Sequence, residues 1–137
     1  MLRVTLDTNI CVSALEFGGV GARLLGMARA GMIGSDVSDA ILDELVTVLR
    51  DDFAWEAYRL QFAREQLAML GNLVTPKKAI DAIKEDPDDD RILECALEAG
   101  SEFIVTSDKD LLRLREFSNI RIVTVSQLLQ QHRALEE

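Results

Sequence analysis

The sequence predicts an α/β fold in which a largely parallel sheet is flanked by helices. Short apolar runs at residues 4–6 and 103–105 are typical of strands buried in a parallel sheet, and stretches with helical spacing alternate with such runs along the chain. The chain has 137 residues, a hydrophobic fraction of 48% and only two prolines, which favours one domain with a sizeable core. We therefore expect the alternating elements to fold as a single unit.

The elements of the first half follow from apolar spacing and from glycine and cap residues. A glycine cluster from Gly18 ends the first helix, and Gly31 closes the second. Gly34 weakens the second strand, and Ser38 is a good N-cap for the third helix. In chain order, these elements are a strand at residues 2–6, helices at 9–15 and 22–30, a strand at 32–37 and a helix with the apolar stripe Ile41, Leu42, Leu45, Val48 and Leu49.

The second half shows the same signals. Residues 53–70 have the spacing of one amphipathic helix or a pair, and their aromatic side chains are typical of a core or a subunit interface. Ser126 is expected to cap the last helix. The other elements, in order, are a brief edge strand at 73–74, a helix at about 91–99, a strand at 103–105, a short helix at 108–113, a strand at 121–125 and the last helix at 127–135.

Composition excludes several classes of function. Cys11 and Cys95 lie in apolar helical patterns, so we expect free thiols and a cytoplasmic location. His132 is the only histidine, which leaves zinc sites and Ser-His-Asp or Cys-His catalysis without the residues they need. No apolar run approaches the roughly 18–20 residues that cross a bilayer. The net charge of −9 has the wrong sign for non-specific binding to phosphates, but it suits carboxylates around a cation or a basic partner.

Two acids follow predicted strands closely. Asp7 comes directly after the strand at residues 2–6, and Asp108 follows the strand at 103–105 after two hydroxyl residues. In open parallel sheets, ligands bind in the crevice beyond the carboxyl ends of the strands. Each carboxylate is therefore placed either to cap the next helix or to hold a ligand in that crevice, and for Asp108 alone capping is the simpler interpretation.

Two further acids lie along the buried faces of helices. Glu44 stands three residues after Ile41 and four before Val48, where an isolated carboxylate lowers stability unless something pairs with it. A boundary glutamate whose stem covers apolar surface explains Glu44 equally well. Asp89 lies on the core-facing line of its helix, whereas the acids on either side of it are turned aside. Helix capping is the alternative for Asp89.

A cluster of these acids would suit a divalent cation. Carboxylates gathered within a few ångströms repel one another, which raises their pKa values unless a cation compensates. An all-carboxylate set without histidine fits Mg²⁺ or Mn²⁺. Such a cluster can activate water and stabilise both sides of a phosphodiester during in-line displacement. The four candidate residues are Asp7, Glu44, Asp89 and Asp108.

The chain resembles the PIN domain family, and most closely the VapC-like ribonucleases of toxin–antitoxin pairs. The resemblance is carried by Leu6-Asp7-Thr8-Asn9, by Ser38 with Ile41 and Glu44-Leu45, by Asp86-Pro87-Asp88-Asp89 before Ile92 and Ala96, and by the run from Val105 to Leu112. It implies one PIN domain over residues 1–137, with a three-layer Rossmann-like fold and a mainly parallel sheet of four to five strands. It also implies a Mg²⁺- or Mn²⁺-dependent endoribonuclease that acts on RNA.

The resemblance also implies a role for each acid. Asp7, Asp89 and Asp108 would ligate the metal, Asp89 would position the attacking water, and Glu44 would complete the cluster. The supporting residues would be Thr8 and Asn9, which orient Asp7, then Thr106 or Ser107, and Asp110 as a supporting or alternative ligand. The resemblance leaves open which acid of the run is the main ligand; the candidates are Asp86, Asp88, Asp89 and Asp90.

Family members commonly form homodimers, and an antitoxin with a basic segment covers the acidic groove of many of them. The resemblance therefore implies a homodimer and a cognate antitoxin, with residues 53–70 as the place for such contacts. A catalytically silent PIN-like interaction module is the main alternative. A phospho-receiver is a further alternative, although it needs an acidic pair after the first strand where this chain has only Asp7. An Asp-x-Asp phosphatase is disfavoured for the same reason.

Overall fold

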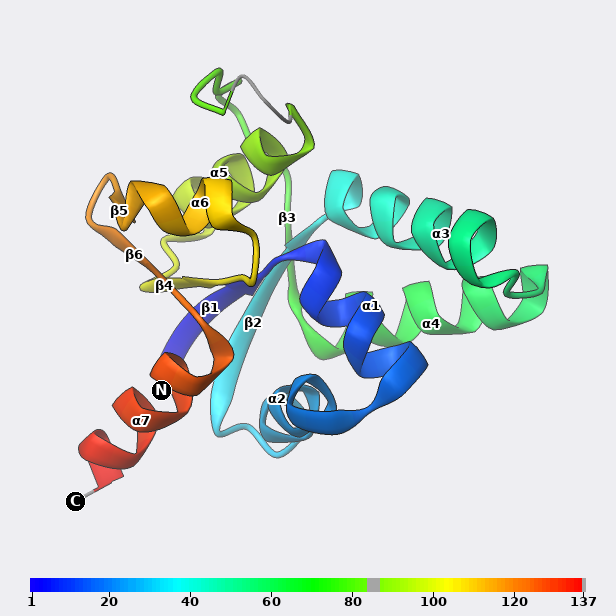
Figure 1. The fold of residues 1–137 in the computed structure, drawn as a ribbon, viewed down its shortest axis with the longest axis horizontal. Helices are drawn as coiled ribbons and strands as arrows, with labels where there is room; N and C mark the ends of the chain where they lie inside the picture. The colour runs from blue at the N-terminus through cyan, green and yellow to red at the C-terminus, as the bar shows by residue number, and fades with distance from the viewer. Residues whose placement is uncertain (84–86, 137) are drawn as a thin grey trace.

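A six-stranded sheet forms the centre of the computed structural model, which describes residues 1–83 and 87–136 (Figure 1). The strand order is β3-β2-β1-β4-β6-β5, and every neighbouring pair is parallel except β5 with β6. Because β1 lies between β2 and β4, the chain reverses direction across the sheet at the β1–β4 pair. The strands are β1 Leu2–Leu6, β2 Ile33–Ser38, β3 Asn72–Val74, β4 Phe103–Val105, β5 Glu116–Phe117 and β6 Ile120–Val123.

Helices cover both faces of the sheet, which gives three layers. One buried cluster joins β1 and β4 to α1, α2 and α7, and a second joins the opposite face of β4 and β6 to α5 and α6. The helices α3 and α4 pack on each other beside β2 and β3. The helices are α1 Thr8–Phe17, α2 Gly19–Arg29, α3 Asp39–Phe53, α4 Ala57–Leu70, α5 Pro87–Ala99, α6 Lys109–Leu114 and α7 Val125–Glu136. The predicted three-layer α/β fold is thereby confirmed.

Among the described residues, no single helix is long and apolar enough to cross a membrane; α1 and α2 together reach the required length and composition, but they meet at a bend of 102°.

Both cysteines are free thiols, as predicted, because Cys11 and Cys95 are buried and form no disulfide. Burial raises the pKa of both thiols to about 12, so neither is a reactive thiolate near neutral pH.

Strand β5 is a sixth strand that the sequence did not predict. It forms a hairpin with β6, in which Phe117 pairs with Ile120 and the two connecting residues, Ser118 and Asn119, have positive φ angles of 49° and 68°. Two consecutive positive φ values are the mark of the tight turn that joins antiparallel strands. The usual sequence signal for that turn contains glycine, which is absent here.

The end of the chain requires a correction. Strand β6 ends at Val123, and α7 begins at Val125, so Ser126 lies inside the helix and is not its cap. Thr124 caps the helix instead: its Oγ1 accepts a hydrogen bond from Gln127 N (3.2 Å), and Thr124 N donates to Gln127 Oε1 (2.9 Å). This reciprocal pair is a capping box, with glutamine at the third helical position.

A buried polar network ties the first two strands to the β3 edge and to the turn before β4. Asp36 is 1% exposed and accepts hydrogen bonds from Ser101 Oγ (2.7 Å), Asn72 Nδ2 (3.2 Å) and the Arg3 guanidinium. Gly34 makes room for the arginine, because a Cβ at position 34 would lie 2.7 Å from Arg3 Nη1. Gly34, which weakened the strand prediction, therefore lets the Arg3 side chain pack across β2.

Candidate metal centre

The carboxyl ends of β1 and β4 lie side by side, and the predicted site residues begin there. Leu6 pairs with Val105 in parallel register, and Asp7 N continues the ladder by donating to Val105 O at 2.9 Å. The chain after β1 enters α1 directly, and the chain after β4 enters α6 through Asp108. Asp7 and Asp108 are thus brought to the same edge of the sheet, as the sequence predicts.

Three carboxylates converge at this edge. Oxygen atoms of Asp89, Asp108 and Asp110 all lie within 4.8 Å of one another, a spacing that can hold a metal ion. Asp89 is 5% exposed in the first turn of α5, and the other two are half-buried at the start of α6. All donors are carboxylate oxygens, which is the chemistry that hard divalent cations prefer. Asp110, predicted only as a supporting or alternative ligand, is a full member of this cluster.

Asp7 lies beside the cluster and is 4% exposed. Burial raises the pKa of its carboxyl above the ordinary value, and the negative charge of Asp108 raises this pKa further. Hydrogen bonds from the Thr106 side chain and from the backbone of Asn9 and Thr8 oppose the increase. The Asp7 carboxylate is therefore held in place by several donors while its negative charge stays uncompensated, and a cation would supply that compensation.

Thr106 connects the two strand-end acids. Its Oγ1 donates to Asp7 Oδ2 at 2.6 Å and accepts from the backbone N–H of Asp108 at 2.9 Å. Thr106 is fully buried, whereas Ser107 is exposed. Of the two hydroxyl residues that the sequence offered, Thr106 makes these contacts.

Asp108 also caps α6. This residue therefore has both of the roles considered from the sequence, as a helix cap and as a member of the acidic cluster. Its Oδ1 accepts from the backbone N–H of Asp110 (2.7 Å) and of Leu111 (3.4 Å). These bonds fix the carboxylate against the helix start, and they bring Asp110 next to it.

Glu44 reaches the site through Thr8. Thr8 is 1% exposed, and its Oγ1 donates to Glu44 Oε2 at 2.9 Å. Glu44 itself is half-buried on α3. The backbone N–H of Asn9 donates a hydrogen bond to the Asp7 carboxylate, and Asn9 as a whole is exposed. Glu44 thus belongs to the hydrogen-bonded surroundings of Asp7 through Thr8, whose backbone N–H donates to the Asp7 carboxylate.

The acidic run before and within α5 divides into separate roles. Asp90 is buried at 2% exposure, contrary to the expectation that it is turned aside, and its Oδ1 accepts from Ala82 N and Ile83 N at 2.9 Å each. Asp88 is exposed. Asp86 lies outside the described residues. Within the part of the run that the structure describes, Asp89 is the acid in the cluster.

Comparison with known proteins agrees with this geometry. A family model described as PIN domain matches residues 3–110. Among solved structures, the chain is similar to one in the crystal structure of VapBC2 from Rickettsia felis bound to a DNA fragment from the promoter, with a TM-score of 0.64 and 17% identity over 90% of this chain and 98% of that chain. No curated protein matches the sequence.

The family match spans most of the chain, so this protein belongs to the PIN domain family. Family membership supports a nuclease, a hydrolase of phosphodiester bonds, at the level of the family. The similarity to the VapBC2 chain supports the fold.

Proposed function

We propose that this protein is a Mg²⁺- or Mn²⁺-dependent endoribonuclease and the toxin of a toxin–antitoxin pair. The observation that carries the proposal is the convergence of Asp89, Asp108 and Asp110 within 4.8 Å beside the buried Asp7. Membership of the PIN domain family supports the same activity. An isolated cluster of acids is destabilising, and a divalent cation is the ligand that reverses the effect.

Asp7, Asp89 and Asp108 would hold the ion, with Asp110 beside them. The ion would supply charge neutralisation at the scissile phosphate and activation of water. Asp89 would position the attacking water, and Thr106 would keep the Asp7 carboxylate in one orientation through its 2.6 Å hydrogen bond. Glu44 would complete the acidic surroundings through its hydrogen bond with Thr8.

The first test combines thermal unfolding with RNA cleavage by the purified protein. We expect Mn²⁺ to raise the melting temperature, because a ligand at 100 times its Kd stabilises the native state by about 2.7 kcal/mol. We expect Mn²⁺-dependent cleavage of structured RNA as well, and Asp7→Asn should abolish both effects. Asp52→Asn, an exposed acid on α3, is the matched control and should behave as wild type. Cleavage by Asp7→Asn at the wild-type rate would exclude Asp7 as a ligand, and a protein without Mn²⁺-dependent cleavage would be a silent interaction module.

We also propose a cognate antitoxin that covers an apolar groove on α4. The groove has a volume of about 590 Å³. Tyr58 and Phe62 at this groove are 69% and 63% exposed, so they lie outside the core, and exposed aromatic side chains of this size mark a partner surface. The groove is lined by side chains of α1, α2 and α4 and by the turn before α4, namely Leu15, Leu25, Arg29, Trp55, Tyr58, Arg59, Phe62, Ala63, Gln66, Leu67 and Leu70. The homodimer stays a prediction.

The partner is tested by asking whether a small reading frame directly upstream encodes a protein that co-purifies with this chain. Phe62→Glu places a charge in the apolar groove and should abolish co-purification. Gln61→Glu adds the same charge at the neighbouring exposed position of α4 and should leave the complex intact. A complex that survives Phe62→Glu would place the partner elsewhere.

A further inference from the structure

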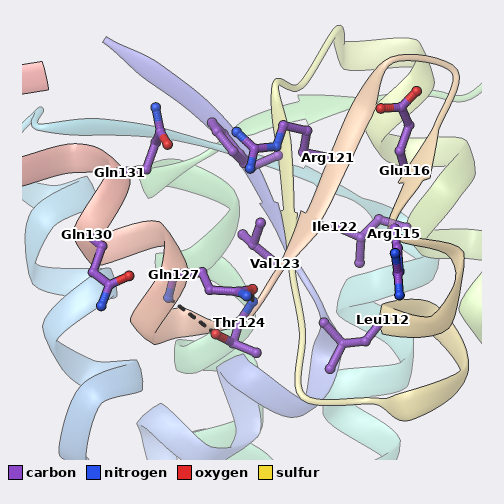
Figure 2. Close-up of a pocket in the computed structure, with 11 residues that line it drawn as sticks. Leu112, Arg115, Glu116, Arg121, Ile122, Val123, Thr124, Gln127, Gln130 and Gln131 are labelled. Carbon is purple, nitrogen blue, oxygen red and sulfur yellow. Dashed lines mark hydrogen bonds between the residues drawn. The ribbon is translucent and has the colours of Figure 1, made fainter. Parts of the chain in front are cut away.

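A second hollow lies at the C-terminal end of α6. It has a volume of about 750 Å³ and is lined by the end of α6, by β6 and by the first half of α7 (Figure 2). Two arginines, Arg115 and Arg121, contribute to it. Its lining residues are Phe103, Leu112, Arg115, Glu116, Arg121, Ile122, Val123, Thr124, Gln127, Gln130 and Gln131. We refer to it as the arginine pocket.

The two guanidinium groups are available to an anion. Within residues 1–83 and 87–136, neither Arg115 nor Arg121 forms an ion pair, although Arg3, Arg50, Arg64, Arg91 and Arg113 all do. The one acid in the pocket, Glu116, is the register partner of Arg121, and its carboxylate points away from Arg115 (Figure 2). In a chain with a net charge of −9, the two arginines outnumber the one acid that lines this hollow and give it a locally positive character.

Arg115 is held in an unfavourable backbone conformation, with φ 62° and ψ −37°. An L-residue with a side chain rarely adopts a positive φ, and such a conformation persists only where its surroundings determine it. Here Arg115 N donates to Leu112 O at 3.1 Å, and Ile122 N donates to Arg115 O at 2.9 Å. The C-terminal end of α6 and strand β6 thus fix the residue at the pocket. A glycine would satisfy the same backbone more cheaply, so the arginine points to a use for its side chain.

The pocket is connected to the metal centre through one strand and one short helix. Thr106 N donates to Val123 O at 3.0 Å, and Val123 lines the pocket. Helix α6 leads from Asp108 at its N-cap to Arg115 at its C-cap. At a helical rise of 1.5 Å per residue, these two residues are about 10 Å apart along the axis. That span corresponds to a few nucleotides at about 3.4 Å each.

The remaining lining residues suit a nucleic acid strand. The Arg121 guanidinium lies over the Phe103 ring at 5.5 Å from the centroid, which leaves its other face for a base to stack on. Glutamine side chains both donate and accept, as the hydrogen-bonding edges of bases require, and α7 brings Gln130 and Gln131 to the pocket beside the capping residue Gln127. An acidic peptide would use the arginines but not this combination of amides and a stacking surface.

We propose that the arginine pocket binds the RNA strand beside the cleavage site, with Arg115 and Arg121 on its phosphates. This inference rests on the proposed nuclease function. It extends that function by naming the surface on which the RNA strand lies next to the metal centre. Guanidinium groups bind phosphate through paired hydrogen bonds, so substitution by glutamine removes both the charge and this geometry.

The test uses a fluorescent single-stranded RNA of mixed sequence and the Asp7→Asn protein in Mg²⁺, so that binding is measured without cleavage. Anisotropy titrations over a KCl series give the Kd and its salt dependence. Adding Arg115→Gln and Arg121→Gln should weaken binding about tenfold or more and reduce the slope of log K against log salt by about 0.7 for each lost phosphate contact. Arg23→Gln with Arg29→Gln, at two exposed arginines on α2, is the control that loses the same charge, and it should change neither quantity by a comparable amount.

Two further measurements separate this proposal from the nuclease proposal. In the otherwise wild-type chain, Arg115→Gln with Arg121→Gln should slow RNA cleavage and leave the Mn²⁺-dependent rise in melting temperature unchanged. Unchanged affinity, salt slope and cleavage in the double variant would overturn the arginine pocket alone, including the case in which the pocket takes an acidic protein segment instead. A parent protein that neither binds nor cleaves RNA would overturn both proposals.

Discussion

The buried carboxyl of Asp7 is the group at which the metal site most clearly lowers the stability of the metal-free fold. It is held by the Thr106 hydroxyl and by two backbone N–H groups, yet burial and the nearby Asp108 raise its pKa. The hydrogen bonds fix its orientation, whereas the low solvent exposure opposes its charge. A group arranged in this way lowers the stability of the metal-free protein and gains when a cation arrives.

This arrangement predicts a pH dependence for the metal-free protein. Below the ordinary pKa of 3.8, Asp7 is protonated in both the folded and the unfolded state and has no electrostatic cost. As the pH rises, the unfolded state loses this proton first, so stability falls until the pH passes the raised pKa of the folded state. Asp7→Asn in EDTA should therefore be more stable than wild type at neutral pH and lose this advantage toward pH 3. Chemical denaturation across that range measures the effect, and an Asp7→Asn variant less stable than wild type at pH 7 would contradict it.

Helix α5 shows how one element can carry two sets of acids. Asp89 faces the metal centre, while Asp90, Glu94 and Glu98 recur at every fourth position and accept backbone N–H groups from the segment before the helix. The hydrogen bonds to Lys77 N and Ile80 N measure 3.0 and 2.8 Å. A run with more acids than capping requires therefore serves both the cluster and the attachment of residues 77–83 to α5.

The start of α7 gives a prediction that separates two neighbouring hydroxyl residues. Thr124→Ala removes the side-chain half of the capping box and should destabilise the protein by about 1 kcal/mol. Ser126→Ala changes an exposed position inside the helix and should stay within about 0.5 kcal/mol of wild type. Urea denaturation of both variants measures the difference, and equal effects, or a larger effect at Ser126, would contradict the capping by Thr124.

Much of the architecture was predictable because local signals and burial agree in this chain. Strand β4 has the predicted bounds, and strand β1 begins and ends where its apolar run does. The edge where Asp7 and Asp108 meet was predictable too, since parallel strands end on the same side of a sheet. The place of Asp89 in the cluster followed from helical spacing, which put this residue on the core-facing line of α5, whereas the burial of the neighbouring Asp90 did not follow.

The remaining features depend on contacts between segments distant in sequence. Arg3 and Asp36 are 33 residues apart, and nothing in either local pattern announces their buried pairing. The burial of Asp90 depends on a loop that folds back over α5, and strand β5 is only two residues long. The pocket formed around Arg115 and Arg121 could not be predicted from the local sequence, because the placement of both side chains depends on the hairpin and on the backbone conformation at Arg115.

The central claim is that the acids at the carboxyl edge of the sheet hold one divalent cation in common. Anomalous diffraction from crystals of this protein grown with Mn²⁺ tests it directly. We expect an anomalous peak within coordination distance of the carboxylates of Asp89 and Asp108, next to Asp7, and no such peak in Asp7→Asn crystals under the same conditions. Crystals of the wild-type protein without Mn²⁺ at these carboxylates, or with the ion bound at another part of the surface, would contradict the claim.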